Sequence, residues 1–447
     1  MIAPAPNQVQ VKEVGMSVGI WSSPAYEPDY DSLVQDDRIH RSLYTEPIVF
    51  SHEMERIFGC AWVYLGHESE IPEPNDFKLT NLGTRPVILS RDADGTVRAF
   101  FNRCSHRGVT VCNQDRGNTS RFTCSYHGWT YSSSGELLNV PFSSGMGESF
   151  NLDEWGLQRL DRVDSYRGFV FGVLSDSGPS LAEHLGTAAT LIDEWVDRAP
   201  DGELVVRHGT RRIVARANWK LYLDGAADGL HPFSTHRSFV EMSARHSDGL
   251  FLSQFRRDPD DSQMYSMALG NGHQYLDQRP GMDGHVWDAT RPAPGTEATV
   301  GALEARYGSE GISEILERTT IAGMNVFIFP NLSLVDNSIG VVQPRSVNMT
   351  EVLWHVTSLA GAEPESLPLR LRIGEDFPNF GDPDDIENWE RAQRGLELVP
   401  EVEWLHTGRG VEGEEGTNQY DVTNEGPMRA YHREWLRFMR TDDAESK

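Results

Sequence analysis

Cysteine is scarce in this chain: 447 residues include only Cys60, Cys104, Cys112 and Cys124. This number is too small for the disulfide framework that stabilises small secreted domains, and it favours a reducing compartment. The sequence also lacks the run of roughly 18 apolar residues that a membrane span needs. It has no basic start followed by an apolar core, so no signal peptide is visible. We therefore expect a cytoplasmic protein.

Positive charge is scarce as well. The chain has 40 Lys and Arg against 67 Asp and Glu, which gives a formal net charge of -27 at pH 7. Nucleic acids and anionic membranes attract basic surfaces, so this balance argues against both as partners. No internal repeat and no glycine-rich nucleotide-binding loop is visible. The length allows two domains with a sizeable core.

What the chain does contain is a concentration of metal-binding side chains between residues 104 and 129. Each half of this stretch supplies one cysteine, one histidine and one glycine: Cys104-Ser105-His106-Arg107-Gly108 and Cys124-Ser125-Tyr126-His127-Gly128. A [2Fe–2S] cluster with mixed ligation needs two sulfurs on one iron and two ring nitrogens on the other. The glycines fit tight loops that approach such a cluster closely. Zinc binding and simple packing are the alternatives, but zinc fingers normally group the two cysteines and the two histidines.

Hydrophobic periodicity predicts mixed helix and strand. Residues 76–172 show short alternating runs separated by turn residues, which is typical of a small antiparallel β domain with the metal-binding loops on its hairpins. Helices are expected over 180–198, 384–398 and 428–439, and strands over 203–216, 325–330, 339–342 and 352–356. We expect loops over 258–300, because Gly, Pro and Asp are frequent there, and disorder in the first dozen residues.

A second candidate metal site lies in residues 218–236. His231 and His236 are separated by four residues, and carboxylates lie just upstream. Two imidazoles and one carboxylate on one face of an iron leave the opposite face open for O2 and substrate, as in non-haem iron oxygenases. Paired histidines at this spacing are also common as surface or core residues, so the pair alone is a weak signal. Its combination with the preceding cluster motif makes it strong.

With these two motifs the chain resembles the large (α) subunit of Rieske non-haem iron aromatic ring-hydroxylating dioxygenases. The motifs are most similar to those of the members that act on benzoate, anthranilate and related aromatic carboxylates. The resemblance implies two cofactors, a [2Fe–2S] Rieske cluster and a mononuclear Fe(II). Its implied cluster ligands are Cys104, His106, Cys124 and His127, and its implied iron ligands are His231, His236 and Asp385.

The third iron ligand belongs, by resemblance, to an Asp-Asp pair that opens a late helix. We choose Asp385, and Asp384, Asp382 and Asp376 are the competing choices.

Asp228 matches the family's bridging aspartate. It would connect the cluster ligand His127 of one chain to the iron ligand His231 of the next, because a carboxylate that holds the second nitrogen of a metal-bound imidazole also orients the ring. In the alternative interpretation, Asp228 merely caps a turn.

The resemblance implies an α+β fold, with a Rieske-type antiparallel β domain and a catalytic domain whose antiparallel sheet is covered by helices (helix-grip type). We expect an N-terminal segment over 1–58 that packs on the catalytic domain, the Rieske domain over 59–172 and the catalytic domain over 173–447. The implied assembly is a homotrimer of α subunits, with or without three small β subunits. A separate reductase, with or without a ferredoxin, would bring electrons from NAD(P)H.

The substrate is expected to be a monocyclic aromatic carboxylate that is cis-dihydroxylated with O2. The interval from Asp224 to His231 has the length found in the aromatic-carboxylate members, whereas naphthalene-type members generally have one more residue. The chain departs from the family at Asp224-Gly225, often Glu-Asn, and at Leu230, often Tyr. A carboxylate substrate needs a cation near the pocket, for which Arg237 and Arg345 are candidates.

Three other functions use parts of the same pattern. The chain would suit a dioxygenase of a polycyclic or amino-substituted arene, which needs an apolar pocket, or a Rieske monooxygenase or demethylase with the same metals. A pure Rieske electron carrier is the third, but it has no use for His231, His236 and Asp385.

Overall fold

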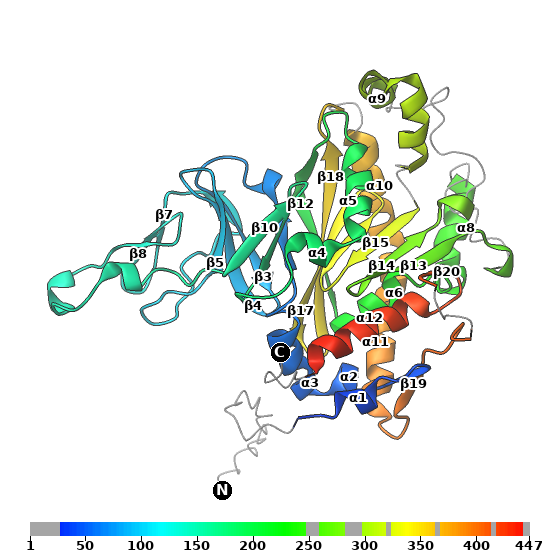
Figure 1. Cartoon of the computed structure of the whole chain (residues 1–447), viewed down its shortest axis with the longest axis horizontal. Helices are drawn as coiled ribbons and strands as arrows, with labels where there is room; N and C mark the ends of the chain where they lie inside the picture. Colours follow the sequence, from blue (N-terminus) through cyan, green and yellow to red (C-terminus); the bar gives the residue numbers. More distant parts are fainter. Residues whose placement is uncertain are drawn as a thin grey trace, which may run out of the picture.

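The computed structural model describes residues 27–246, 259–281, 297–318, 323–362, 367–412 and 417–440. Small β-sheets form one end of the molecule, and a large sheet with helices around it forms the other (Figure 1). The first dozen residues, for which we expected disorder, lie outside the described ranges. Within these ranges, no helix has the length and apolar character needed to cross a membrane.

The large sheet has eight antiparallel strands in the order β12-β18-β17-β16-β15-β14-β13-β20. Six of them, β13 to β18, form a meander in which each strand pairs with its neighbour in the sequence. The bounds are β12 Leu204–Ala215, β13 Tyr265–Gly270, β14 His273–Asp277, β15 Met324–Ile328, β16 Leu332–Val335, β17 Ser338–Ser346, β18 Met349–Leu359 and β20 Gln419–Asp421. The four strands predicted after residue 200 are therefore confirmed.

The hairpin of β13 and β14 corrects one expectation. Residues 258–300 were expected to form loops, which is wrong for residues 265–277 and for residues 297–300, where α9 (Glu297–Arg318) begins. Asn271 and Gly272 have φ angles of 50° and 76°, the left-handed conformations that a tight hairpin turn requires. The Asn-Gly pair is itself a hairpin signal, but the Gly, Pro and Asp around it obscured the signal. Residues 282–296 of the expected loop region lie outside the described ranges.

The other end of the molecule contains three small antiparallel sheets, in the orders β5-β4-β3-β6, β7-β8-β9 and β10-β11-β2. Their bounds are β2 Val63–His67, β3 Asp76–Leu82, β4 Arg85–Arg91, β5 Val97–Phe101, β6 Arg116–Asn118, β7 Arg121–Thr123, β8 Thr130–Ser132, β9 Leu137–Asn139, β10 Arg162–Tyr166 and β11 Phe169–Val173. Phe77, Phe100 and Phe122 pack in one core with Cys104 and Cys124. The antiparallel β domain predicted for this region is confirmed.

Helices cover the large sheet and support the second candidate site. They are α1 Tyr30–Leu33, α2 Ser42–Thr45, α3 Pro47–Arg56, α4 Leu181–Leu185, α5 Ala188–Asp197, α6 Trp219–Ala226, α7 Pro232–Thr235, α8 Arg237–His246, α9 Glu297–Arg318, α10 Leu367–Phe380, α11 Asp382–Leu398 and α12 Gly426–Met439. The predictions for α11 and α12 are confirmed. The helix predicted over 180–198 is divided into α4 and α5, because Gly186 adopts a φ of 49°. The short β1 (Arg38–His40) pairs with β19 (Trp404–His406).

A buried ion pair fixes α6 in the structure. Nζ of Lys220 lies 2.6 Å from Oε1 of Glu53 on α3, and both side chains have no exposed surface. Glu53 also accepts the indole N–H of Trp219 at 2.8 Å and that of Trp435, on α12, at 2.7 Å. Burial lowers the pKa of Lys220, and the neighbouring Glu53 opposes that effect. Three helices are thus joined through one carboxylate.

Replacing Glu53 by Gln should lower the free energy of unfolding by about 3–5 kcal/mol, because the buried ammonium of Lys220 would lose its compensating charge. Denaturant unfolding measures this loss. Glu55→Gln is the matched control: Glu55 is exposed on the same helix, and its replacement should change stability by less than about 0.5 kcal/mol. Equal effects of the two substitutions would contradict the role given to the ion pair.

Candidate metal centres

The two halves of the cysteine–histidine motif fold as matching loops. In each, the cysteine N–H donates to the carbonyl five residues later, at 2.7 Å for Cys104 and 2.8 Å for Cys124. The glycine N–H donates back to the cysteine carbonyl, at 2.9 Å for Gly108 and 3.0 Å for Gly128. These glycines have φ angles of 80° and 71°, which L side chains rarely adopt. The repeated motif is therefore a repeated backbone conformation.

The loops bring together the donor set of a mixed-ligand cluster. Cys104 and Cys124 are buried, with 1% and 2% exposure, and the rings of His106 and His127 have centroids 4.5 Å apart. Among the residues that the structure describes, none is a hydrogen-bond partner of the buried Nδ1 of His127, which is costly unless another group binds it. Two thiols and two adjacent imidazoles at paired loop tips fit a [2Fe–2S] cluster.

Tyr131, on β8, is a further residue of this site that we did not predict. Its Oη accepts the backbone N–H of Ser105 at 3.1 Å and lies 3.1 Å from Sγ of Cys104. Burial and the contact with Cys104 raise the pKa of Tyr131, so the hydroxyl stays protonated. It can therefore donate a hydrogen bond to the sulfur of Cys104 when that sulfur is a cluster-bound thiolate. Such a bond favours the more negative, reduced state of a cluster. The sequence offered no signal for this contact beyond the tyrosine's place after the second loop.

Tyr131→Phe should therefore lower the reduction potential of the cluster. The expected decrease is about 60 mV for each 1.4 kcal/mol by which the bond favours the reduced state. A redox titration followed by visible absorbance measures it. Tyr126→Phe is the control, because Tyr126 lies in the second loop with 57% exposure. An unchanged potential in Tyr131→Phe would contradict the role of the hydroxyl.

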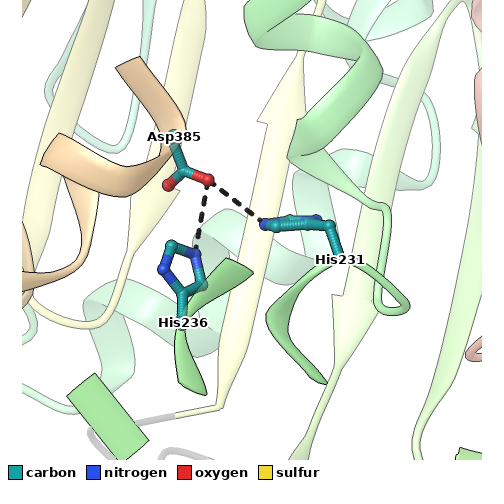
Figure 2. Close-up of side chains that lie close together, drawn as sticks. All are labelled: His231, His236 and Asp385. Carbon is teal, nitrogen blue, oxygen red and sulfur yellow. Dashed lines mark ion pairs between the residues drawn. The ribbon is translucent and has the colours of Figure 1, made fainter. Parts of the chain in front are cut away.

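The second candidate site combines two segments that are distant in the sequence. His231 and His236 flank α7, and Asp385 lies in the first turn of α11. Oδ1 of Asp385 is 3.5 Å from Nε2 of His231 and 3.3 Å from Nε2 of His236 (Figure 2). One ligand atom from each residue lies within 4.8 Å of the other two.

This geometry fits a metal ion. With metal–ligand bonds of about 2.1 Å, ligands at right angles lie about 3 Å apart, which is close to the separations from Asp385. His236 and Asp385 are buried at 3% and 8% exposure, so the donor atoms converge where water has little access. Two imidazoles and one carboxylate are the facial set that non-haem iron oxygenases use.

The alternatives to Asp385 differ in position. Oδ2 of Asp384 lies 3.7 Å from Nδ1 of His236, the ring nitrogen that does not face Asp385. Asp382 is buried, and burial followed by the charge of Asp385 raises its pKa to about 7. The side chain of Asp376 lies outside what the structure describes. Of the described candidates, Asp385 is the carboxylate that approaches both histidines.

Asp228 contacts the outer nitrogen of His231. Its Oδ2 is 3.4 Å from Nδ1 of His231, and its Oδ1 accepts the backbone N–H groups of Leu230 at 2.8 Å and His231 at 3.3 Å. Burial acts to raise the pKa of Asp228, but the contacts with His231 and the backbone donors outweigh it and lower that pKa. The same ion pair outweighs burial at His231 and raises its pKa. Through these backbone contacts Asp228 caps a turn. Its side chain is also 39% exposed, so it reaches the surface.

The two arginines considered as substrate anchors have other partners. Arg345 binds Glu351 and, at 2.8 Å, Gln343; Glu351 also pairs with Arg212 at 2.8 Å, so Arg345 has its partners within the large sheet. The side chain of Arg237 is 79% exposed and pairs with Glu241 at 3.1 Å on the same helix. Neither arginine has an ion pair with the carboxylates of the second site among the contacts that the structure describes.

Comparison with known families assigns both parts of the chain. Residues 61–157 match the Rieske [2Fe-2S] domain, and residues 203–441 match the catalytic domain of the ring-hydroxylating alpha subunit. The second match covers more than half of the chain. The protein therefore belongs to the alpha subunits of the ring-hydroxylating dioxygenases, oxidoreductases that combine a Rieske cluster with a mononuclear iron.

Its curated relatives include three oxygenases named for aromatic acids. The 2-halobenzoate 1,2-dioxygenase large subunit of Burkholderia cepacia is 34% identical over 85% of this chain and 82% of its own. Toluate 1,2-dioxygenase subunit alpha of Pseudomonas putida is 35% identical over 82% of each chain. The anthranilate 1,2-dioxygenase large subunit of Acinetobacter baylyi is 34% identical over 83% and 80%.

Among solved structures, the naphthalene 1,2-dioxygenase from Rhodococcus sp. bound to indole has a TM-score of 0.75 and 29% identity. The match covers 91% of this chain and 95% of that one. The expected fold, an antiparallel Rieske domain with a helix-covered catalytic sheet, is thus confirmed.

Proposed function

We propose that this chain is the large subunit of a terminal oxygenase that cis-dihydroxylates a monocyclic aromatic carboxylate. O2, two electrons and two protons are consumed, and the electrons come from NAD(P)H through a separate reductase, with or without a ferredoxin. The observation that carries the reaction class is the convergence of His231, His236 and Asp385 in a chain with a Rieske domain. The substrate class is supported by the relatives named for halobenzoate, toluate and anthranilate.

The proposed ligands divide between 59–172, assigned as the Rieske domain, and 173–447, assigned as the catalytic domain. The cluster ligands are Cys104, His106, Cys124 and His127, and the iron ligands are His231, His236 and Asp385. When bound, the cluster supplies electrons one at a time and the mononuclear iron supplies a site for O2 activation. Asp228 holds Nδ1 of His231 and thereby sets the orientation of this ring toward Asp385.

We place the electron route between subunits. Figure 1 shows the β7–β8 hairpin at one end of the molecule and α6 and α11 in the other half, beside the large sheet, so the two candidate sites of one chain lie in different parts of the molecule. Asp228 is accessible at the surface, and so is Phe142 in the Rieske part, at 94% exposure. A closed ring of three subunits would cover such surfaces and bring His127 of one subunit to Asp228 of the next. Three small β subunits would complete the assembly.

Asp228→Asn should reduce turnover about 10- to 100-fold, because the amide cannot hold the imidazole of His231 as a carboxylate does. Product formation is measured at matched iron content, about three atoms per chain. Asp76→Asn is the control: Asp76 also caps a turn, accepting the N–H of Glu73 at 2.8 Å, but it lies in the Rieske part. If both variants turn over normally, Asp228 is only a turn cap.

The substrate class is tested with a panel of benzoates, anilines and naphthalene, with electrons supplied by a reductase of the benzoate type. The benzoates should show the highest kcat/KM, by more than about tenfold. A site that binds the substrate carboxylate discriminates strongly against compounds that lack this group. Chromatography identifies a cis-diol, whereas a phenol or a demethylated product would indicate monooxygenation. Turnover of naphthalene without turnover of any carboxylate would exclude the aromatic-acid assignment.

A further inference from the structure

A cluster of buried polar side chains surrounds Asp224, which precedes Asp228 by four residues. The reaction proposed above does not use this cluster. Asp224 is on α6, one helical turn before Asp228. Its Oδ2 accepts the hydroxyl of Tyr44, from α2, at 2.8 Å, and its Oδ1 accepts the hydroxyl of Tyr431, from α12. Nε2 of His432, also on α12, is 3.5 Å from Oδ1. Both tyrosines are fully buried and His432 is 1% exposed.

The protons of this cluster can be counted. Nδ1 of His432 lies 2.9 Å from the carbonyl oxygen of Met428, so Nδ1 carries the proton and Nε2 is an acceptor. Oη of Tyr44 lies within reach of two acceptors, Oδ2 of Asp224 and, at 3.3 Å, Nε2 of His432. When Asp224 is ionised, the single proton of Tyr44 can satisfy only one of them.

A proton on Asp224 removes this conflict. The acid then donates from Oδ2 to Tyr44, Tyr44 donates to Nε2 of His432, and Tyr431 still donates to Oδ1. Every polar atom of the cluster has a partner in this arrangement, whereas the ionised form leaves a buried acceptor unsatisfied, which is costly.

The charges around Asp224 also favour the neutral acid. Lys220, one turn earlier on α6, is already paired with Glu53, and Asp228, one turn later, is an anion. His432 is neutral, because burial lowers its pKa to about 3. Burial, reinforced by the charge of Asp228 and opposed by the tyrosine hydroxyls and Lys220, raises the pKa of Asp224 to about 7.

We propose that Asp224 is a positioning residue of the electron route, which holds a proton in the resting enzyme and so adds no second negative charge to that of Asp228 on the Nδ1 side of His231. Among the contacts that the structure describes, those of Asp224 are with Tyr44, Tyr431 and His432 and not with the proposed ligands. Asp224 acts through Asp228, so the proposal rests on the function proposed for that residue. Loss of the proton to solvent places a second anion one turn from Asp228. This anion opposes the arrival of an electron at the second metal site, so transfer slows as pH rises through neutrality.

The protonation state can be measured without turnover. Infrared difference spectra of wild type minus Asp224→Asn should show the C=O band of a protonated carboxylic acid at about pH 6, which disappears toward about pH 9. An absent band at about pH 6 would overturn the proposal. Because this measurement needs no substrate and no reductase, its failure is distinct from a failure of the proposed reaction.

The consequence for electron transfer is measured by stopped-flow oxidation of the reduced cluster in the substrate-bound holoenzyme. In wild type the rate should fall about tenfold between about pH 6 and about pH 9, corresponding to about 1.4 kcal/mol. In Asp224→Asn the amide can donate to Tyr44, so the rate of cluster oxidation at about pH 6 should be retained. The decrease of this rate at alkaline pH should be lost. The proposal would be overturned if this variant showed the same decrease of the rate at alkaline pH. It would also be overturned if the variant, with both metals bound, showed no cluster oxidation at about pH 6.

Tyr431→Phe provides an independent variant in case Asp224→Asn does not fold. This substitution removes a hydrogen-bond donor that favours the ionised form of Asp224, so the pKa of Asp224 should rise. The decrease in the rate of cluster oxidation should therefore occur at higher pH. Tyr265→Phe is the matched control, since Tyr265 donates at 2.9 Å to a buried aspartate, Asp277, whose charge Arg279 compensates at 2.7 Å. If the rate of cluster oxidation in Tyr431→Phe decreased at the same pH as in wild type, or if Tyr265→Phe shifted this pH equally, the role of Asp224 would be contradicted.

Discussion

The arrangement of the second candidate metal site depends on the buried ion pair between Lys220 and Glu53. This pair, with the indoles that share its carboxylate, holds α6 between α3 and α12. The chain after α6 presents Asp228 and His231, and the contact from α12 also brings Tyr431 to Asp224. The orientation of the His231 imidazole, a proposed metal ligand, therefore depends on a buried ion pair outside the candidate site, as expected when surrounding groups orient a ligand.

The sequence predicted those parts of the site that depend on local spacing. The two cysteine–histidine loops and the pair His231 and His236 are each contained in a few residues, so their pattern is visible without a structure. Asp385 was chosen because of the resemblance to a family, since its contact with the histidines joins segments about 150 residues apart. Tyr131 and the contacts of Asp224 were missed, because a hydroxyl that reaches a distant side chain leaves no periodic signal.

The fold was predicted where hydrophobic periodicity was strong, as in α11, α12 and the strands around 325–356. It was not predicted where a single residue decides the local structure. Gly186 divides one periodic helix into two, and the Asn271-Gly272 turn lies within residues whose composition is typical of loops. The contact of Arg345 was not predicted for a different reason: its partner Glu351 lies across a hairpin, so this contact is a property of strand register.

The order of strands in the large sheet has a consequence for the assembly of the metal site during folding. Strands β13 to β18 pair with their sequence neighbours, but β12 pairs with β18, from Leu204 opposite Leu359 to Ala215 opposite Thr350. The histidines follow β12 and Asp385 follows β18, so the three candidate ligands come together in the structure that contains this long-range pairing. Long-range pairings form slowly because they close large loops. If His231, His236 and Asp385 bind a metal, the three ligands are together only when this pairing has formed, so metal binding is coupled to the closure of the sheet.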